Sequence, residues 1–213
     1  MLRVRSFAVI ALALTTIGGM AKASTDVGGP ITTSRTWTLA GSPYIVNSSI
    51  LIGGDATLTI QPGVEVRFNA GLGITVGSQQ FGPGTLKAQG TAGAKIHFHS
   101  NVQPQKSGAW ARIHFTDFAV DADFDAAGSY LSGSIIQHAI VEYAGAGNVA
   151  AVTIERSRPY LSFCDIRHNT NRGIFVDGSG SFTPPQRIDD CEVWDSLASE
   201  ATPTWLVGPP EPR

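Results

Sequence analysis

The sequence is poor in charge. Asp, Glu, Lys and Arg make up only 15% of its 213 residues, whereas soluble domains average roughly 25%. A formal net charge of −2 offers no basic surface for nucleic acid, and the composition lacks the Ala, Glu, Lys and Leu excess of coiled coils and helical bundles. The 42% hydrophobic content excludes intrinsic disorder. The 24 glycines and 12 prolines therefore indicate a turn-rich, strand-rich fold.

Long hydrophobic runs are also missing. The longest covers residues 7–17 and is broken only by two threonines, so it is shorter than the ~20 residues that span a bilayer. Two arginines precede this run and Ala21-Lys22-Ala23 follows it, which predicts a secretory signal peptide over residues 1–23, cut after Ala23. We therefore expect a secreted or periplasmic protein with no membrane span.

A short apolar pattern recurs in the second half of the chain. The pattern begins with an apolar residue. A small or apolar residue stands three positions after it, and another apolar residue stands two positions after that second one. The copies are Trp110-Ile113-Phe115, Ile136-Ala139-Val141, Leu161-Cys164-Ile166 and Ile188-Cys191-Val193. They start 25 to 27 residues apart. Residues two apart on a strand share one face, so we expect the last two members of each copy to point inward.

The mature chain shows no helical periodicity with caps. Short alternating strands continue through its first half, separated by turns such as Gln61-Pro62-Gly63. Strands that recur at a full-coil period predict an all-β right-handed parallel β-helix, a solenoid of about six to seven coils. Equivalent residues would stack ~4.8 Å apart. The expected interior ladders are Ile113, Ala139, Cys164 and Cys191, and then Phe115, Val141, Ile166 and Val193.

Several segments resemble the bacterial right-handed parallel β-helix repeat proteins, relatives of the pectin-lyase-like fold. The resemblance covers residues 44–196. The segments that carry it are 56–64 (ATLTIQPGV), 84–91 (GTLKAQGT), 108–115 (GAWARIHF), 139–145 (AIVEYAG) and 161–169 (LSFCDIRHN). The resemblance implies architecture more than activity, because this fold hosts lyases, hydrolases, adhesins and inert spacers.

The expected organisation is a single structural domain with flanking segments. After the signal peptide come an N-terminal leader or cap (24–43), the β-helix domain (44–197) and a Pro-rich C-terminal tail or cap (198–213).

Acidic residues gather on the last two expected coils. The repeat places Asp165, Asp190 and Glu192 close together on the outward face, with Arg167 beside them. Glycosidases use two carboxyl groups separated by ~5 to 9.5 Å, so these four residues are candidate catalytic groups. The chain lacks the Gly-His-Gly and Arg-Ile-Lys elements of pectin-degrading relatives. A solvated face without catalysis is therefore the competing interpretation.

Other outward positions are candidates for ligand binding, namely His114, His138, Glu142 and Trp194. On a solvated face we expect Glu142 to pair with Arg167, and Arg167 to lie over Trp194. The expected function is a non-enzymatic surface or matrix module that binds polysaccharide or another cell-surface ligand. The alternatives are a polysaccharide hydrolase or lyase and a structural spacer or truncated fragment. The oligomeric state is left open.

One acidic stretch is a candidate calcium site. Asp121, Asp123 and Asp125 alternate like the start of a calcium-binding loop. Ala126 replaces the glycine and Ser132 the glutamate that an EF-hand requires, so only a looser calcium site is expected. Four closely spaced ligands for structural zinc are absent from the sequence pattern, and no other cofactor is expected.

The two cysteines, Cys164 and Cys191, occupy equivalent positions on neighbouring coils. They could be stacked buried thiols, because free Cys is a common core residue. They could also form a disulfide, which an oxidising compartment permits. A bridge between parallel neighbours has an allowed Cα separation, but its parallel Cβ vectors disfavour the dihedral.

Overall fold

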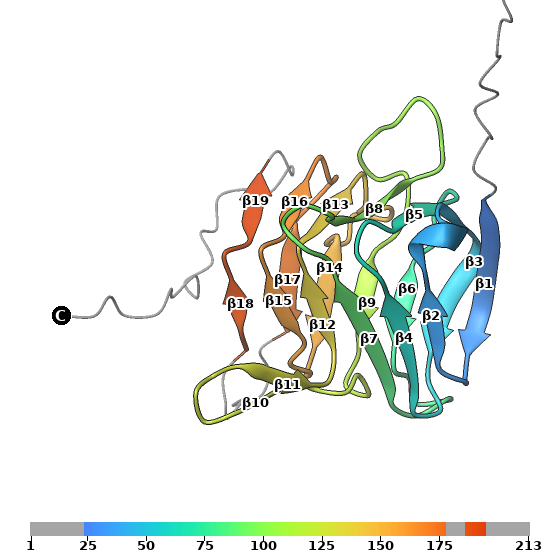
Figure 1. Ribbon diagram of the computed structural model, residues 1–213. Helices are drawn as coiled ribbons and strands as arrows, with labels where there is room; N and C mark the ends of the chain where they lie inside the picture. Colours follow the sequence, from blue (N-terminus) through green and yellow to red (C-terminus); the bar gives the residue numbers. More distant parts are fainter. Residues whose placement is uncertain (1–23, 178–185, 195–213) are drawn as a thin grey trace, which may run out of the picture.

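The computed structural model describes residues 24–177 and 186–194 (Figure 1). These residues form nineteen strands and one 3-10 turn, η1 (Leu39–Gly41). The named strands pair in parallel except for β10 with β11. The all-β, parallel-strand prediction is thus confirmed. The expected signal peptide (1–23) and C-terminal tail (198–213) lie outside the described residues.

The strands form three parallel rows, here called rows A, B and C. Row A contains β5 (Glu65–Phe68), β8 (Ile96–Ser100), β13 (Ala139–Glu142), β16 (Asp165–Arg167) and β19 (Glu192–Trp194). Row B contains β6 (Ile74–Val76), β9 (Ile113–Phe115), β14 (Val152–Glu155) and β17 (Ile174–Asp177). Row C contains β2 (Arg35–Trp37), β4 (Ala56–Ile60), β7 (Gly84–Gln89), β12 (Ile135–Gln137), β15 (Tyr160–Ser162) and β18 (Ile188–Asp189).

The longest strand, β3 (Tyr44–Ile52), belongs to two rows. Its first half pairs with β5 of row A and its second half with β6 of row B, so these rows form one eleven-stranded sheet. On its other side β3 pairs with β1 (Thr25–Ile31). Residues 24–43, which we expected to be a leader or cap, therefore contribute β1 and β2 to the sheets.

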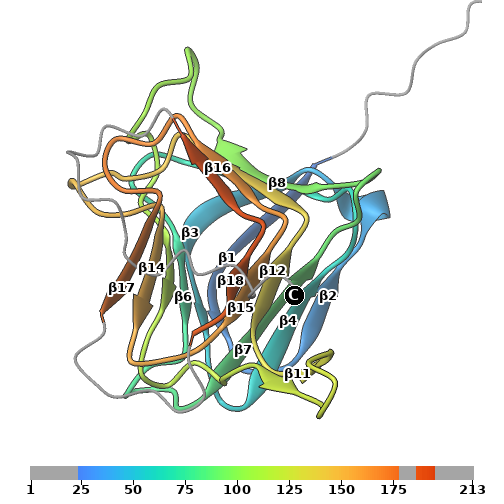
Figure 2. The ribbon, with the colours of Figure 1, turned by 90° about the vertical axis from the view of Figure 1, so that its left-hand side faces the viewer.

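The chain repeats one route through the three rows, which we call a winding. It passes through row C, then row A, then row B, as in β4-β5-β6, β7-β8-β9, β12-β13-β14 and β15-β16-β17. Figure 2 shows the rows arranged around one common interior. The result is a solenoid-like architecture.

The interior is filled by alternate residues of each strand, because successive side chains point to opposite faces. Leu58 and Leu86 enter from row C, Phe68 and Phe98 from row A, and Phe115 from row B, and each is fully buried. Trp110 adds the largest buried side chain and stacks on Phe68 with ring centroids 4.1 Å apart. This continuous apolar core fixes which side chains face outward.

The structure corrects one part of the expected ladders. Val141, Ile166 and Val193 are register partners, as predicted. Ile113 and Phe115 do not continue that ladder: they lie on β9 in row B, where Phe115 pairs with Ile154. On the preceding winding, the row A partner of Val141 is Phe98.

The error arises from one long winding. Between β8 and β9 lies the segment 101–112, the loop at the top of Figure 1. Between β9 and β12 lies the segment 116–134, which carries the antiparallel hairpin of β10 (Asp123–Phe124) and β11 (Tyr130–Ser132). These additions place Ile113 at an apparent repeat spacing from Ala139 by coincidence.

Among the described residues, no helix has the length and apolar character needed to cross a membrane.

Candidate functional site

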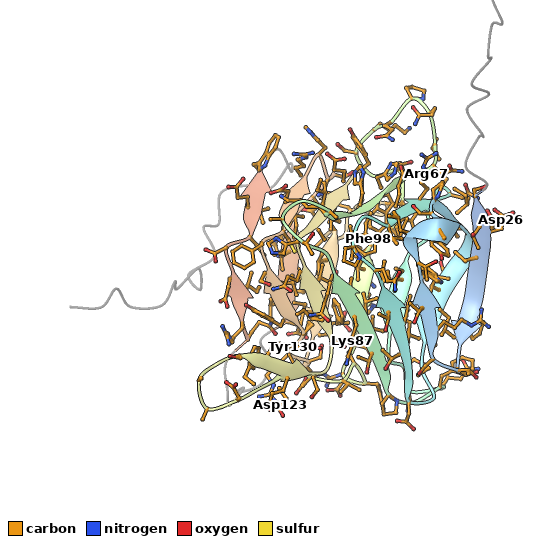
Figure 3. All side chains as sticks on the ribbon, viewed as in Figure 1. Asp26, Arg67, Lys87, Phe98, Asp123 and Tyr130 are labelled. Atoms are coloured by element: carbon orange, nitrogen blue, oxygen red, sulfur yellow. The ribbon has the colours of Figure 1, made fainter. Side chains whose placement is uncertain are left out.

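The outward side of row A carries mostly ionisable side chains, which together with Trp194 we call the ionic face; Ile140 of β13 interrupts it between His97 and Asp165. The strands of this row direct apolar residues such as Phe98 inward (Figure 3). The ionic face consists of Glu65, Arg67, His97, His99, Glu142, Asp165, Arg167, Glu192 and Trp194, with Lys95 just before β8.

Glu65 is the centre of one ionic group. Arg67 donates from Nε to Glu65 Oε1 at 2.9 Å and from Nη2 to Oε2 at 3.0 Å. His99 Nε2 lies 2.6 Å from Glu65 Oε1. The His99 side chain is only 7% exposed, and Gln105 of the 101–112 loop contacts its Nδ1 at 3.2 Å. This carboxylate therefore joins β5 to β8 through a half-buried network.

Glu142 is the centre of a second group. Arg167 donates from Nε to Glu142 Oε1 at 2.6 Å, and His97 Nε2 lies 2.7 Å from Oε2. The Glu142 side chain is 8% exposed. The expected pairing of Glu142 with Arg167 is therefore confirmed, and Arg167 also lies over the Trp194 ring, with its guanidinium carbon 5.4 Å from the ring centroid.

Two stacked imidazoles connect these groups. The His97 and His99 rings lie 4.2 Å apart between centroids, with an interplanar angle of 17°. Potential ligand atoms of Glu65, His97 and His99 all lie within 4.8 Å of one another. The two carboxylates, the two histidines and the flanking arginines thus form one connected polar cluster across four strands.

The electrostatics of the cluster favour ionised acids beside a neutral histidine. Burial alone would raise the pKa of Glu142, but hydrogen bonds from Arg167 and His97 outweigh burial and hold it below 4.5. Burial likewise opposes ionisation of Glu65, yet Arg67 and His99 lower its pKa overall. Desolvation, followed by the positive charge of His97, lowers the pKa of His99 below 6.5.

Three of the four candidate catalytic residues lie at the C-terminal end of the ionic face, and the fourth, Asp190, lies between β18 and β19. Asp165 and Glu192 are register partners on β16 and β19, as the repeat predicted. Lys95 binds Asp165, with Nζ 2.7 Å from Oδ2, so this acid has a cationic partner. Asp190 precedes β19 in a left-handed conformation, with φ of 51°. Arg167, the fourth candidate, is held by Glu142.

Aromatic rings border the same end. The Tyr143 and His168 rings stack with centroids 5.8 Å apart, and the edge of His168 meets Trp194 at 5.2 Å. Tyr143 and His168 directly follow Glu142 and Arg167, at the corner where row A ends. Polar groups, the half-buried rings of Tyr143 and His168 and the exposed Trp194 ring therefore lie side by side.

The four candidate binding residues do not form one site. Glu142 and Trp194 both belong to the ionic face. His114 lies on β9 in row B, 3.2 Å from Glu155, because the long winding moves it away from the row in which the sequence placed it. His138 stacks on Phe163 at 4.8 Å, at the corner between rows C and A.

The candidate calcium residues are engaged separately. Arg158 holds Asp121 through its backbone N at 2.7 Å and its guanidinium at 2.7 and 2.9 Å. Asp123 accepts a hydrogen bond from the Phe124 backbone, and Asp125 from two backbone N–H groups within its own turn. Among the described residues the three carboxylates therefore do not converge as expected. Asp123 lies on the hairpin at the lower end of the molecule (Figure 3).

The hairpin packs against the β15–β18 part of row C. Its Phe124 meets the Tyr160 ring edge to face at 5.2 Å. Arg187 lies over Phe124, 4.3 Å from the ring centroid. Tyr160 and Arg187 belong to the β15–β18 part of row C.

Both cysteines are free. Cys164 is buried and Cys191 half-buried, and their thiols interact, which raises the pKa of Cys164 and lowers that of Cys191. The structure thus has the stacked-thiol arrangement of the two alternatives.

Sequence reasoning missed the centre of the ionic face. Glu65, Arg67, His97 and His99 are not among the candidate residues that the sequence pattern selects. The available signal was the alternation His97-Phe98-His99, which places two imidazoles on one face of a strand. Only the pairing of β5 with β8 shows that Glu65 lies opposite His97.

Comparisons with known proteins add no relative. No protein-family model matches the chain, and neither the curated proteins nor the solved structures contain a match.

Acid is expected to destabilise the folded protein before its carboxylates titrate. Burial, and then the charge of Arg112, lowers the pKa of His114 below 6.5, although Glu155 opposes this shift. As the pH falls below 6.5, the unfolded chain therefore binds the proton before the folded protein does. The free energy of unfolding decreases from pH 6.5 down to the lower pKa of folded His114. Urea titrations between about pH 7.5 and 5 measure the loss.

A His114→Asn variant should show a shallower pH dependence than the wild type. Some dependence should remain, because the pKa of His99 is lowered in the same direction. An identical slope in the variant and the wild type would contradict this role of His114.

Proposed function

We propose that this protein is a secreted right-handed parallel β-helix of the pectin-lyase-like type that binds polysaccharide without cleaving it. The repeated winding through three parallel rows supports the β-helix assignment. A ladder of side chains at one corner supports it too: Asn69 Nδ2 donates to Asn47 at 2.7 Å, and Asn101 Nδ2 donates to Asn69 at 2.9 Å. Stacked like residues are what in-register windings produce.

The observation that carries the binding proposal is the group of rings beside the ionic face, which we call the ring border: Tyr143, His168 and Trp194. Aromatic rings combine apolar area with a polar edge at small conformational cost, and carboxylate and guanidinium groups can bond to sugar hydroxyls. Solenoids present such features along extended surfaces, which suits a polymer. Glu65, Glu142 and Asp165 are each paired with a cation, so we favour a weakly charged polysaccharide over a polyanion.

Removal of one border ring should weaken binding. Tyr143→Ala is expected to reduce affinity for a neutral polysaccharide about tenfold, equivalent to ~1.4 kcal/mol. Affinity electrophoresis in gels that contain neutral glucans, mannans or polygalacturonate would measure it. Phe175→Ala is the control, because Phe175 is an exposed ring in row B. Equal losses in both variants, or no retention of the wild type in any gel, would contradict the proposal.

A polysaccharide hydrolase or lyase is the second candidate, favoured by one observation. Asp165 and Glu192 are register partners on adjacent strands, a spacing compatible with paired carboxyl chemistry. Release of reducing sugars or unsaturated products by the wild type, with loss in Asp190→Asn and Glu192→Gln, would replace the binding proposal with an enzyme.

The extracytoplasmic location is part of the proposal. It depends on the signal-peptide pattern over residues 1–23. N-terminal sequencing of the exported protein should begin at Ser24.

A further inference from the structure

The centre of the ionic face holds donor groups that transition metals prefer. His97 and His99 project from one strand, and Glu65 projects from the strand paired with it. Their potential ligand atoms lie within 4.8 Å of one another. We propose that Glu65, His97 and His99 bind one divalent transition-metal ion, with Zn²⁺ the preferred metal.

The geometry requires only small side-chain movements. Zn–N and Zn–O bonds of ~2.0 to 2.2 Å in a tetrahedron bring ligand atoms to roughly 3.4 Å from one another. His99 Nε2 and Glu65 Oε1 are already closer than this, at 2.6 Å. Rotation of the half-exposed His97 side chain supplies the remaining adjustment, while the parallel strand pair keeps all three backbones fixed.

The surrounding residues are suited to a second layer of support. Glu142 lies 2.7 Å from His97 Nε2 and can act as a fourth ligand or orient the ring. When His99 binds the metal through Nε2, its Nδ1 carries the ring proton, so the Gln105 amide, whose Nε2 is now 3.2 Å from Nδ1, has to turn its Oε1 toward that proton to orient the ring. Arg67 and Arg167 keep both carboxylates ionised, as metal ligands must be.

The donor set also indicates which metals are bound poorly. Imidazole suits Zn²⁺, Cu²⁺, Ni²⁺ and Co²⁺, whereas Ca²⁺ and Mg²⁺ prefer oxygen ligands. Two histidines and one carboxylate leave a coordination position for water or another ligand.

Metal titration of the full chain after EDTA treatment and dialysis tests the site. We expect isothermal titration calorimetry to show one equivalent of Zn²⁺, with no binding of Ca²⁺. Co²⁺ should give the visible absorption of a nitrogen- and oxygen-ligated ion. His97→Gln and Glu65→Gln should each weaken Zn²⁺ binding by at least about tenfold, the lower end of losses seen when metal-site groups are removed.

Two control variants test whether ligand groups outside the cluster bind the metal instead. His138→Asn removes a histidine outside the cluster and suits its left-handed backbone, with φ of 46°. Cys191→Ser removes the thiol pair as a possible ligand set. Both controls should bind Zn²⁺ like the wild type.

The titration contains no polysaccharide, so its outcome is independent of the proposed sugar binding. Absence of Zn²⁺ binding by folded wild-type protein would overturn the metal site. Unchanged Zn²⁺ affinity in His97→Gln and Glu65→Gln would also overturn it. The same holds if Cys191→Ser loses both Zn²⁺ binding and a thiolate–metal absorption band that the wild type shows. Circular dichroism of each variant shows that the fold is retained.

Discussion

Replacing Trp110 with alanine is expected to lower the free energy of unfolding by about 3 to 5 kcal/mol. The Trp110 side chain is fully buried and stacks on Phe68. Its Nε1 donates a 2.7 Å hydrogen bond to the backbone carbonyl of Glu142. Alanine would leave both a large cavity and a buried carbonyl without this donor. The side chain connects β5 to β13, so its loss affects two windings.

Trp110→Phe separates these two contributions. It keeps a ring against Phe68 but removes the donor to Glu142, and should cost about 1 to 3 kcal/mol. Urea unfolding followed by circular dichroism measures both variants. An alanine variant that loses less than the phenylalanine variant would contradict the role of the buried stack.

Gly77→Ala is expected to be the second severe substitution, at more than about 4 kcal/mol or with loss of the fold. Gly77 directly follows β6 and has φ of +72°. A Cβ there would overlap the Phe118 backbone carbonyl and lie 2.6 Å from the Ala119 nitrogen. Backbone atoms of the neighbouring winding cannot move aside without breaking their own pairing.

Gly71→Ala provides a matched control. Gly71 has nearly the same backbone angle, with φ of +71°, but a Cβ there would meet no atom within 4 Å. Only the left-handed strain remains, which costs ~1 to 2 kcal/mol. Thermal or urea unfolding of the two variants should therefore differ by several-fold in destabilisation. Similar losses would show that backbone angle, not close approach, decides both cases.

The fold was largely predictable because its strands repeat the same inward pattern. Val141, Ile166 and Val193 were predicted as register partners from spacing alone, since equivalent positions of neighbouring windings must bury equivalent groups. Phe115 was misplaced because local sequence does not indicate how long a corner segment is. The segments Lys95-Ile96-His97-Phe98 and Arg112-Ile113-His114-Phe115 look alike in sequence, but they lie on either side of the 101–112 loop and belong to different rows.

The ionic face was predictable only at its C-terminal end. There the windings are short, so Glu142, Arg167 and Trp194 fall at regular intervals. The contacts of Glu65 with His99 and of His97 with Glu142 join residues 34 and 45 positions apart. These contacts are diagonal, because they join residues that are not directly opposite each other on paired strands. They depend on strand register and side-chain direction, which neither composition nor residue spacing predicts.

The placement of β3 has a consequence for how the chain can be assembled over time. A strand that starts two rows can serve as the template for everything that follows, and β1 to β6 lie together within residues 25–76. Each later winding then adds to an edge already formed, after only a few dozen further residues arrive. Folding can thus proceed in the direction of synthesis, with the N-terminal portion ordered while the remainder is still being made.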